Sequence, residues 1–185
     1  MKRDPPLPDQ PKTIERAIRR ALSVSDLVVL TGGSSVGERD YLPSIFPRFG
    51  RMLFHGVAVR PGKPTLAVVH RGKLVLGMPG HPTSCLANGF WLLYPLVRKL
   101  ARLPTPGWTD RTLRLSVDYM PPSPNLATVI PLAVRGGRGI PTFHDSSAIT
   151  SLRAATAFAI VPPRGRLARG SPLAAHELPH PLVAR

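Results

Sequence analysis

A short apolar run at residues 27–30, followed at once by a glycine-rich segment at 31–40, constrains the fold of this chain more than any other feature. The run reads Leu-Val-Val-Leu, and the segment reads Thr-Gly-Gly-Ser-Ser-Val-Gly-Glu-Arg-Asp. Apolar runs of this length that are rich in β-branched residues are typical of buried parallel strands. Gly32 and Gly33 then allow a sharp turn that presents bare amide N–H groups. The pattern predicts a strand that ends in a loop suited to an anion.

Two further segments carry polar groups on turns. The first, Arg-Pro-Gly-Lys-Pro at residues 60–64, is a stiff turn with two cations. Cations beside a proline-fixed turn lose little entropy on binding, so Lys63, and less surely Arg60, are expected to meet phosphate. The alternative is a surface loop whose charges face water. The second segment, Gly-Met-Pro-Gly-His-Pro-Thr-Ser at 77–84, joins an apolar run to an expected helix.

These three segments, taken together, resemble the MoeA/gephyrin family of molybdopterin molybdenumtransferases, in its C-terminal half. The family patterns are approximately GGxSxGxxD, PGKP and G-L/M-PGNP-x-S, in that order, and all three fall here within residues 32–84. His81 departs from the pattern, because the family usually has Asn there. The sister family, molybdopterin adenylyltransferase, shares the α/β fold, but it typically reads TGGTG at the first loop and lacks the β domain.

The resemblance implies a role in molybdenum cofactor biosynthesis: molybdate is inserted into adenylyl-molybdopterin, and AMP is released. Mg²⁺ is the implied cofactor, and the pterin nucleotide and molybdate are the substrates. In the family the active site lies between the α/β domain and domains of a dimer partner. A homodimer or a companion N-terminal chain is therefore expected. The missing N-terminal domains are expected to be encoded just upstream or in an adjacent gene. The isolated chain is expected to bind the pterin weakly.

The resemblance also assigns roles to individual residues. Catalysis falls to Asp40, Asp9 and Ser35, and the implied metal ligands are Asp9, Glu38 and Asp40. The expected pterin-binding residues are Gly32, Gly33, Ser34, Ser35, Gly37, Arg60, Lys63, Pro79, Gly80, Pro82 and Ser84. The residues themselves leave simpler roles open: Asp40 is a candidate N-cap for the next helix, and Asp9 a candidate helix start.

The hydrophobic pattern predicts an α/β first part and a β-rich second part. Expected helices cover residues 12–22, 41–49 and, with a kink at Pro95, 83–102. Expected strands cover 27–30, 52–59, 65–70, 74–77, 112–117, 127–134, 157–161 and 172–176. Helices alternating with buried strands predict an α/β domain at 1–103, a three-layer, mostly parallel sheet that resembles the adenylyltransferase fold with a shortened N-terminus. A linker at 104–107 and a small mainly β domain at 108–185, for which a barrel is one candidate form, complete the expected organisation.

Composition narrows the class of protein. Of 185 residues, 43% are apolar and 19% charged, which is typical of a globular protein rather than a disordered one. Neither a membrane-spanning run nor an apolar leader is recognised, so a cytoplasmic location is expected. A single cysteine, Cys85, excludes an internal disulfide. The net charge of +15 favours anionic ligands, but aromatics are only 6%, so nucleic acid is a minor hypothesis. A non-catalytic molybdopterin-binding or assembly module is the main alternative to an enzyme.

Overall fold

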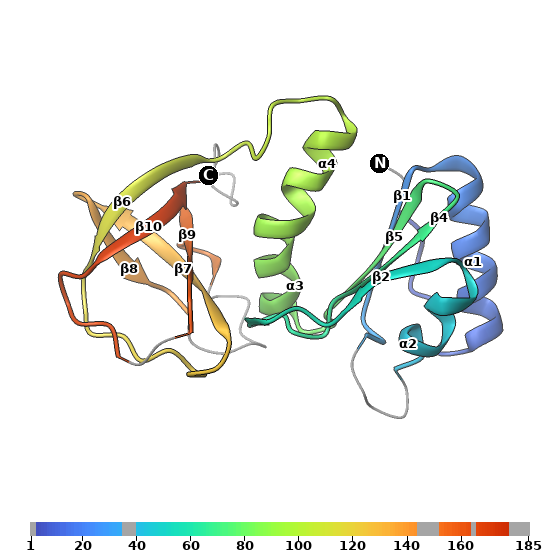
Figure 1. Cartoon of the computed structure of the whole chain (residues 1–185), viewed down its shortest axis with the longest axis horizontal. Coiled ribbons are helices and arrows are strands. Elements are labelled where there is room, and N and C mark those ends of the chain that lie inside the picture. The colour runs from blue at the N-terminus through green and yellow to red at the C-terminus, as the bar shows by residue number, and fades with distance from the viewer. Residues whose placement is uncertain (1–2, 35–39, 144–151, 164–165, 178–185) are drawn as a thin grey trace. The chain divides into compact units, whose positions relative to one another are not determined.

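The chain forms two compact units in the computed structural model (Figure 1), which describes residues 3–34, 40–143, 152–163 and 166–177. The first unit comprises residues 1–57 and 64–80, and the second comprises 58–63 and 81–185. The units do not follow the expected division at residues 104–107, because the turn at 58–63 and the helices at 81–103 belong with the β-rich part.

The first unit is built on a four-stranded sheet in the order β1-β5-β4-β2. Its strands are β1 (Leu27–Thr31), β2 (Arg51–His55), β4 (Leu66–His70) and β5 (Lys73–Met78). Only β1 and β5 run parallel, whereas β4 pairs antiparallel with both β5 and β2. The expectation of a mostly parallel sheet is therefore wrong. The tight turn at Arg71 and Gly72, both with positive φ, can join only antiparallel strands, since parallel neighbours need a long crossover.

One face of this sheet is covered by α1 (Pro11–Val24), α2 (Leu42–Ile45) and the 3₁₀ turn η1 (Phe46–Arg48), which lie on the same side in Figure 1. The predicted stripe of α1 is confirmed, since Ile14, Ile18 and Leu22 are its buried residues. They pack in one core with strand and helix residues that include Val28, Ile45, Phe46, Leu66, Val68 and Val75. Within this unit the described elements therefore form two layers, not the expected three.

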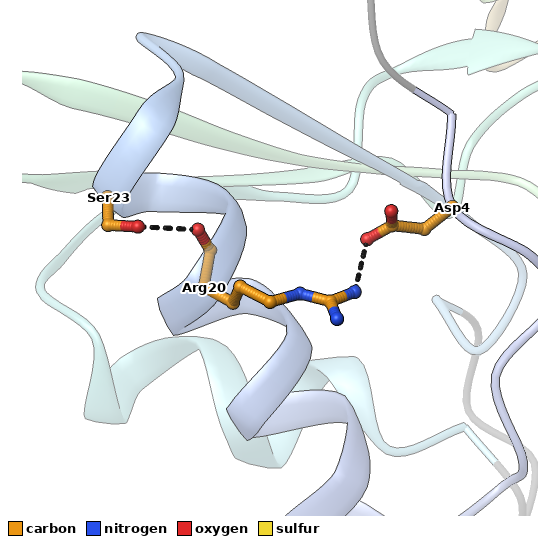
Figure 2. A network of polar contacts seen from close by, with 3 residues as sticks. All are labelled: Asp4, Arg20 and Ser23. Carbon is orange, nitrogen blue, oxygen red and sulfur yellow. Dashed lines mark hydrogen bonds and ion pairs between the residues drawn. The ribbon is translucent and has the colours of Figure 1, made fainter.

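An ion pair connects the chain entering α1 to the body of that helix. Arg20 Nη2 lies 2.8 Å from Asp4 Oδ2, and the Ser23 hydroxyl donates to the Arg20 carbonyl oxygen at 2.8 Å (Figure 2). The Arg20 side chain is 65% exposed, so the pair stabilises by no more than about 1 kcal/mol. Its effect is to hold residues near the N-terminus against the helix.

The second unit opens with a helical segment in three parts: α3 (Pro82–Asn88), the π-helical η2 (Gly89–Leu93) and α4 (Tyr94–Leu100). The sequence predicts a kink at Pro95, and the irregular turn comes directly before it. Proline has no N–H to donate, and its ring clashes with the carbonyl four residues earlier. A wider π turn accommodates both effects, as is common for such bulges.

The rest of the second unit is a closed barrel, visible in Figure 1 around β6 to β10. The strands are β6 (Thr109–Leu115), β7 (Ala127–Arg135), β8 (Arg138–Pro141), β9 (Ala157–Val161) and β10 (Pro172–Glu177), with β3 (Val59–Arg60) added alongside β7. Pairing of β7 with β9 closes the ring of five strands. The predicted mainly β part, including the barrel, is confirmed, and its interior is filled by residues such as Leu113, Leu115, Ile130, Leu132 and Leu173.

Aromatic rings join the helical segment to this barrel. Phe158 of β9 lies 6.3 Å from Phe90, 5.3 Å from Trp108 and 5.0 Å from His176, measured between ring centroids. Such contacts add to the burial of Phe158, which is 1% exposed. Among the described residues, no helix combines the length and apolar character that crossing a membrane requires.

Candidate functional site

Two glycine-rich loops leave the sheet of the first unit from neighbouring strand ends. Because β1 and β5 are parallel and in register, with Thr31 opposite Met78, their carboxyl ends lie side by side. Crevices at the carboxyl ends of parallel strands are where ligands bind in open α/β sheets. The parallel pair of this sheet therefore places the start of the first motif, at 32–34, beside the start of the third, at 77–80.

Backbone geometry explains the glycines of the first motif. Gly32 and Gly33 have φ of +86° and +63°, a region that other residues rarely adopt. The Gly32 N–H donates to the Met78 carbonyl oxygen at 3.0 Å, and the Leu42 N–H donates to the Gly33 carbonyl oxygen at 3.0 Å. Of the amides expected to hold an anion, that of Gly32 is thus engaged within the protein and fixes the loop to β5.

Ser34 reinforces the same connection. It is 2% exposed, and its hydroxyl donates to the Met78 carbonyl oxygen at 3.2 Å. The Met78 carbonyl therefore accepts from the backbone of one loop residue and the side chain of another. The buried Ser34 side chain therefore helps to fix the loop to the end of β5. The neighbouring residues Ser35, Gly37 and Glu38 lie outside the described residues, and the roles assigned to them stay predictions.

The two loops also approach each other backbone to backbone. A Cβ atom placed on Gly80 would lie 3.2 Å from the Gly32 Cα, closer than nearly all real Cβ contacts. Gly80 is exposed, whereas Pro79 before it is buried. A side chain at position 80 would require the loops to separate by a few tenths of an ångström, so glycine favours this close approach.

Asp40 is half-buried at the end of the first loop, just before the Leu42–Gly33 hydrogen bond closes it. Tyr41 occupies the N-cap position of α2, and its side chain makes no capping hydrogen bond. Asp40 therefore lies one residue before the N-cap position. Likewise, Gln10 rather than Asp9 is the N-cap of α1, and Asp9 is exposed.

The metal set predicted from the sequence is not complete among the described residues. No group of three or more His, Cys, Asp or Glu side chains suited to a metal ion occurs in the described part of the chain. Glu38, one of the three predicted ligands, lies outside it. Mg²⁺ typically uses one or two carboxylates together with substrate phosphates, so Asp9 and Asp40 remain chemically suitable donors.

The second motif belongs to the second unit, where it is fixed by a buried amide. Asn88 is fully buried, and its Nδ2 donates to the Gly62 carbonyl oxygen at 2.8 Å. Trp91 Nε1 in turn donates to Asn88 Oδ1 at 2.9 Å, which orients the amide. The turn is thus attached to α3, while Arg60 and Lys63 on either side of it are exposed.

The end of the third motif also lies in the second unit, at the start of α3. Pro82 is exposed at the first position of the helix, as is typical for proline, and His81 before it is the N-cap. Ser84 is 6% exposed and Thr83 is fully buried. The predicted site residues therefore fall into two groups. Gly32, Gly33, Ser34, Asp40, Pro79 and Gly80 are brought together in the first unit, and Arg60, Lys63, Pro82 and Ser84 are positioned within the second.

Along the chain, the two glycine loops at the strand ends are followed by a helical segment and a five-stranded barrel. The model of the probable molybdopterin binding domain family matches residues 2–99, more than half of the chain. The chain belongs to this family.

Known proteins extend the likeness beyond the matched domain. A molybdopterin molybdenumtransferase of Staphylococcus epidermidis is 34% identical over 156 residues, which cover 82% of this chain and 37% of that protein. The enzyme of the same name from Haemophilus influenzae is 37% identical over 94 residues, or 51% of this chain and 23% of that protein. The predicted resemblance to molybdopterin molybdenumtransferase is confirmed, and the chain spans well under half the length of these curated relatives.

A solved structure agrees with both units. The molybdopterin biosynthesis MoeA protein of Pyrococcus horikoshii superimposes with a TM-score of 0.75 at 31% identity and covers 91% of this chain. The chain covers 41% of that protein. The likeness therefore includes the barrel as well as the domain that carries the glycine loops.

Proposed function

We propose that this chain binds adenylyl-molybdopterin at the loops that follow β1 and β5 and takes part in molybdate insertion with release of AMP, as a step of molybdenum cofactor biosynthesis. The observation that carries the proposal is the contact between Gly32 and Gly80 at the carboxyl ends of the parallel pair, inside the matched domain. Two loops that meet without side chains leave backbone accessible to a flat, anionic ligand.

Within this proposal Asp40 acts beside molybdate, and Lys63 and Arg60 meet phosphate oxygens. Support for Asp40 comes from its half-buried position at the closure of the first loop. Support for Lys63 comes from the Asn88 clamp, which presents an exposed cation on a rigid turn. A preorganised cation stabilises negative charge without reorganisation during the reaction.

The metal in this proposal is Mg²⁺, held by phosphate oxygens and by one or two of the carboxylates Asp9, Glu38 and Asp40. Once bound, it supplies positive charge that neutralises the phosphates. The remaining wall of the cleft is contributed by a second copy of the chain or by a companion chain, because closing a site over its ligand excludes water. These partners are part of the proposal.

The test combines binding and turnover. Purified chain is titrated with adenylyl-molybdopterin, and molybdate-dependent AMP release is followed with and without a companion chain carrying the N-terminal domains of a relative. Asp40→Asn is expected to abolish AMP release in the complemented enzyme and to leave pterin binding measurable. Asp26→Asn, which changes an acid at the opposite end of β1, is the matched control and is expected to retain turnover.

Two results would count against this function. Unchanged AMP release in Asp40→Asn would remove the role of that carboxylate. Full insertion activity by a stable monomer of the isolated chain would show that no second wall is needed. Binding without turnover in every combination would assign the chain the alternative role, a non-catalytic molybdopterin-binding or assembly module.

A further inference from the structure

Three exposed arginines lie directly opposite one another on the outer face of the barrel. Arg135 and Arg138 are cross-strand partners at the β7–β8 hairpin, and Arg138 is the partner of Arg114 on β6. Their strand neighbours Leu113, Leu115 and Gly139 are buried, so the three side chains project outward. Directly opposed residues have Cβ atoms about 4.5–5.5 Å apart. We call this set the arginine row.

The arginine row has no acidic partner in the described part of the barrel. None of its members takes part in the ion pairs of the described residues. Arg114 donates instead to the Gly170 carbonyl oxygen at 3.1 Å. Like charges directly opposite one another destabilise a sheet. Three guanidinium groups in a row therefore weaken the free barrel and favour an added anion.

More positive charge adjoins the row where residues 118–120 pair with 166–170. Tyr119 and Leu167 exchange both backbone hydrogen bonds there. The Asp118 carboxylate accepts from the Arg166 guanidinium and from the Arg169 N–H, so one acid serves two arginines. The acids Asp110 and Glu177 lie at the opposite ends of β6 and β10, paired with His176 and Arg111. Charge on this barrel is therefore segregated along the strands.

Large apolar side chains are also exposed in the segment that follows β6. Met120 is 66% exposed and Val117 is 49% exposed. The aromatic residue of this segment, Tyr119, packs against the barrel core, so in the described part of the surface it offers no face for a base to stack on. Arginine with methionine, depleted in acids, is a composition typical of protein interfaces.

We propose that the arginine row, with Arg166, Arg169, Val117 and Met120 beside it, docks an acidic segment of a partner protein that carries apolar residues between its carboxylates. Guanidinium groups bind carboxylates through two parallel hydrogen bonds, and the row presents three of these groups on neighbouring strands to a segment with several acids. Nucleic acid fits less well, because its affinity without stacking depends on phosphate charge alone. This inference goes beyond the proposed function and does not depend on it.

The experiment measures binding of a short fluorescent peptide rich in Glu and Leu to the full chain at moderate salt. The probes for comparison are the same peptide with Gln in place of Glu, a single-stranded oligonucleotide of equal charge, and inorganic phosphate. The triple variant Arg114→Gln, Arg135→Gln, Arg138→Gln is expected to weaken peptide binding on the order of tenfold. The control triple variant Arg16→Gln, Arg51→Gln, Arg71→Gln removes the same charge from exposed positions of the first unit and is expected to have little effect.

Stability gives a second readout that separates docking from a structural role. Because the row places like charges opposite one another, its triple variant is expected to melt at the same temperature as the wild type or higher. Met120→Gln is expected to weaken binding of the peptide and to leave binding of inorganic phosphate unchanged. Equal loss of binding in both triple variants, tighter binding of the oligonucleotide than of the peptide, or strong destabilisation by the row variant would each overturn the proposal.

Discussion

Two glycines of the motifs, Gly32 and Gly62, share a backbone conformation and differ in what surrounds them. Their φ values are +86° and +112°. A Cβ on Gly32 would meet nothing within 4 Å, whereas a Cβ on Gly62 would lie 2.3–2.6 Å from the amide atoms of Asn88. Glycine at position 32 is thus favoured only by its positive φ. Glycine at position 62 is favoured by its positive φ and also because a Cβ atom there would overlap Asn88.

The difference indicates how each loop takes part in a site. The first loop is fixed by hydrogen bonds to the Met78 carbonyl oxygen, and the position of a Cβ atom on Gly32 is open. The second is filled by a buried side chain from α3 and presents only its flanking cations. The first loop therefore offers open backbone to a ligand, and the second offers exposed cations. Substitutions that distinguish a steric clash at the Cβ position from the cost of a positive φ test this difference.

The largest effect is expected for Gly62→Ala. The added methyl overlaps a fully buried amide in a region of φ that alanine avoids, so a loss of about 2–4 kcal/mol in the free energy of unfolding is expected. Both tryptophans, Trp91 and Trp108, lie in the second unit, so urea denaturation followed by tryptophan fluorescence reports on it.

A double-mutant cycle with Asn88→Ala locates the cause of that loss. Asn88→Ala alone leaves the Gly62 carbonyl and Trp91 Nε1 without this partner, but it also vacates the space that a methyl on residue 62 would need. The double variant is therefore expected to be less destabilised than the sum of the two single variants. Strict additivity would show that crowding at Asn88 is not the reason.

A smaller effect on stability, with a large effect on binding, is expected for Gly32→Ala. Both Gly32 and Gly72 have positive φ and open space at the Cβ position, so alanine at either is expected to cost about 1 kcal/mol. Gly72 lies in the β4–β5 turn, away from the strand ends that carry the loops. Amide hydrogen exchange measures the stability of the first unit, and titration with adenylyl-molybdopterin measures binding. Only Gly32→Ala is expected to weaken binding, and equal weakening by both would contradict the loop assignment.

Local patterns predicted many elements of this fold, because they report burial directly. The i, i+3, i+4 stripe of α1 and the alternation of Leu113, Arg114 and Leu115 in β6 each match a structural face. The glycine loops were also recognisable, since residues that must adopt positive φ are restricted in type. The expected strand at 52–59 instead divides at Gly56, whose φ is +91°, into β2 and β3.

Sequence patterns of this kind do not predict contacts between residues that are far apart in the chain. Asn88 meets Gly62 across 26 residues of sequence, and no spacing rule connects the two. The sheet direction was misjudged although the two-residue turn at Arg71 and Gly72 carried the information, since so short a connection forces antiparallel pairing. Strand β8 was missed because Gly139 and Pro141 have low strand propensity, and the Gly136–Gly137 turn that folds it onto β7 is the feature that predicts it.

The smallest effect on stability is expected at Asp118, whose carboxylate accepts a hydrogen bond from the backbone of the barrel. A hydrogen bond from the Arg169 N–H, followed by one from the Arg166 side chain, holds the pKa of this carboxyl below its ordinary value of 3.8. Because the folded-state pKa is lowered, the stabilisation is fully present above the ordinary value and is lost as the pH falls through the folded pKa. Melting temperatures of the wild type and of Asp118→Asn are expected to converge only under acidic conditions, below about pH 4.

Arg166→Gln distinguishes the two causes of this shift. Because the backbone donor is the larger one, the pKa of Asp118, followed through its carboxyl ¹³C resonance, is expected to stay below the ordinary value in this variant. A return to the ordinary value would show that the arginine side chain, not the backbone, holds the anion. The barrel would then differ from the first unit, where backbone groups of Gly32 and Gly33 make the hydrogen bonds that fix the loop, and the comparison between the two units would have to be redrawn.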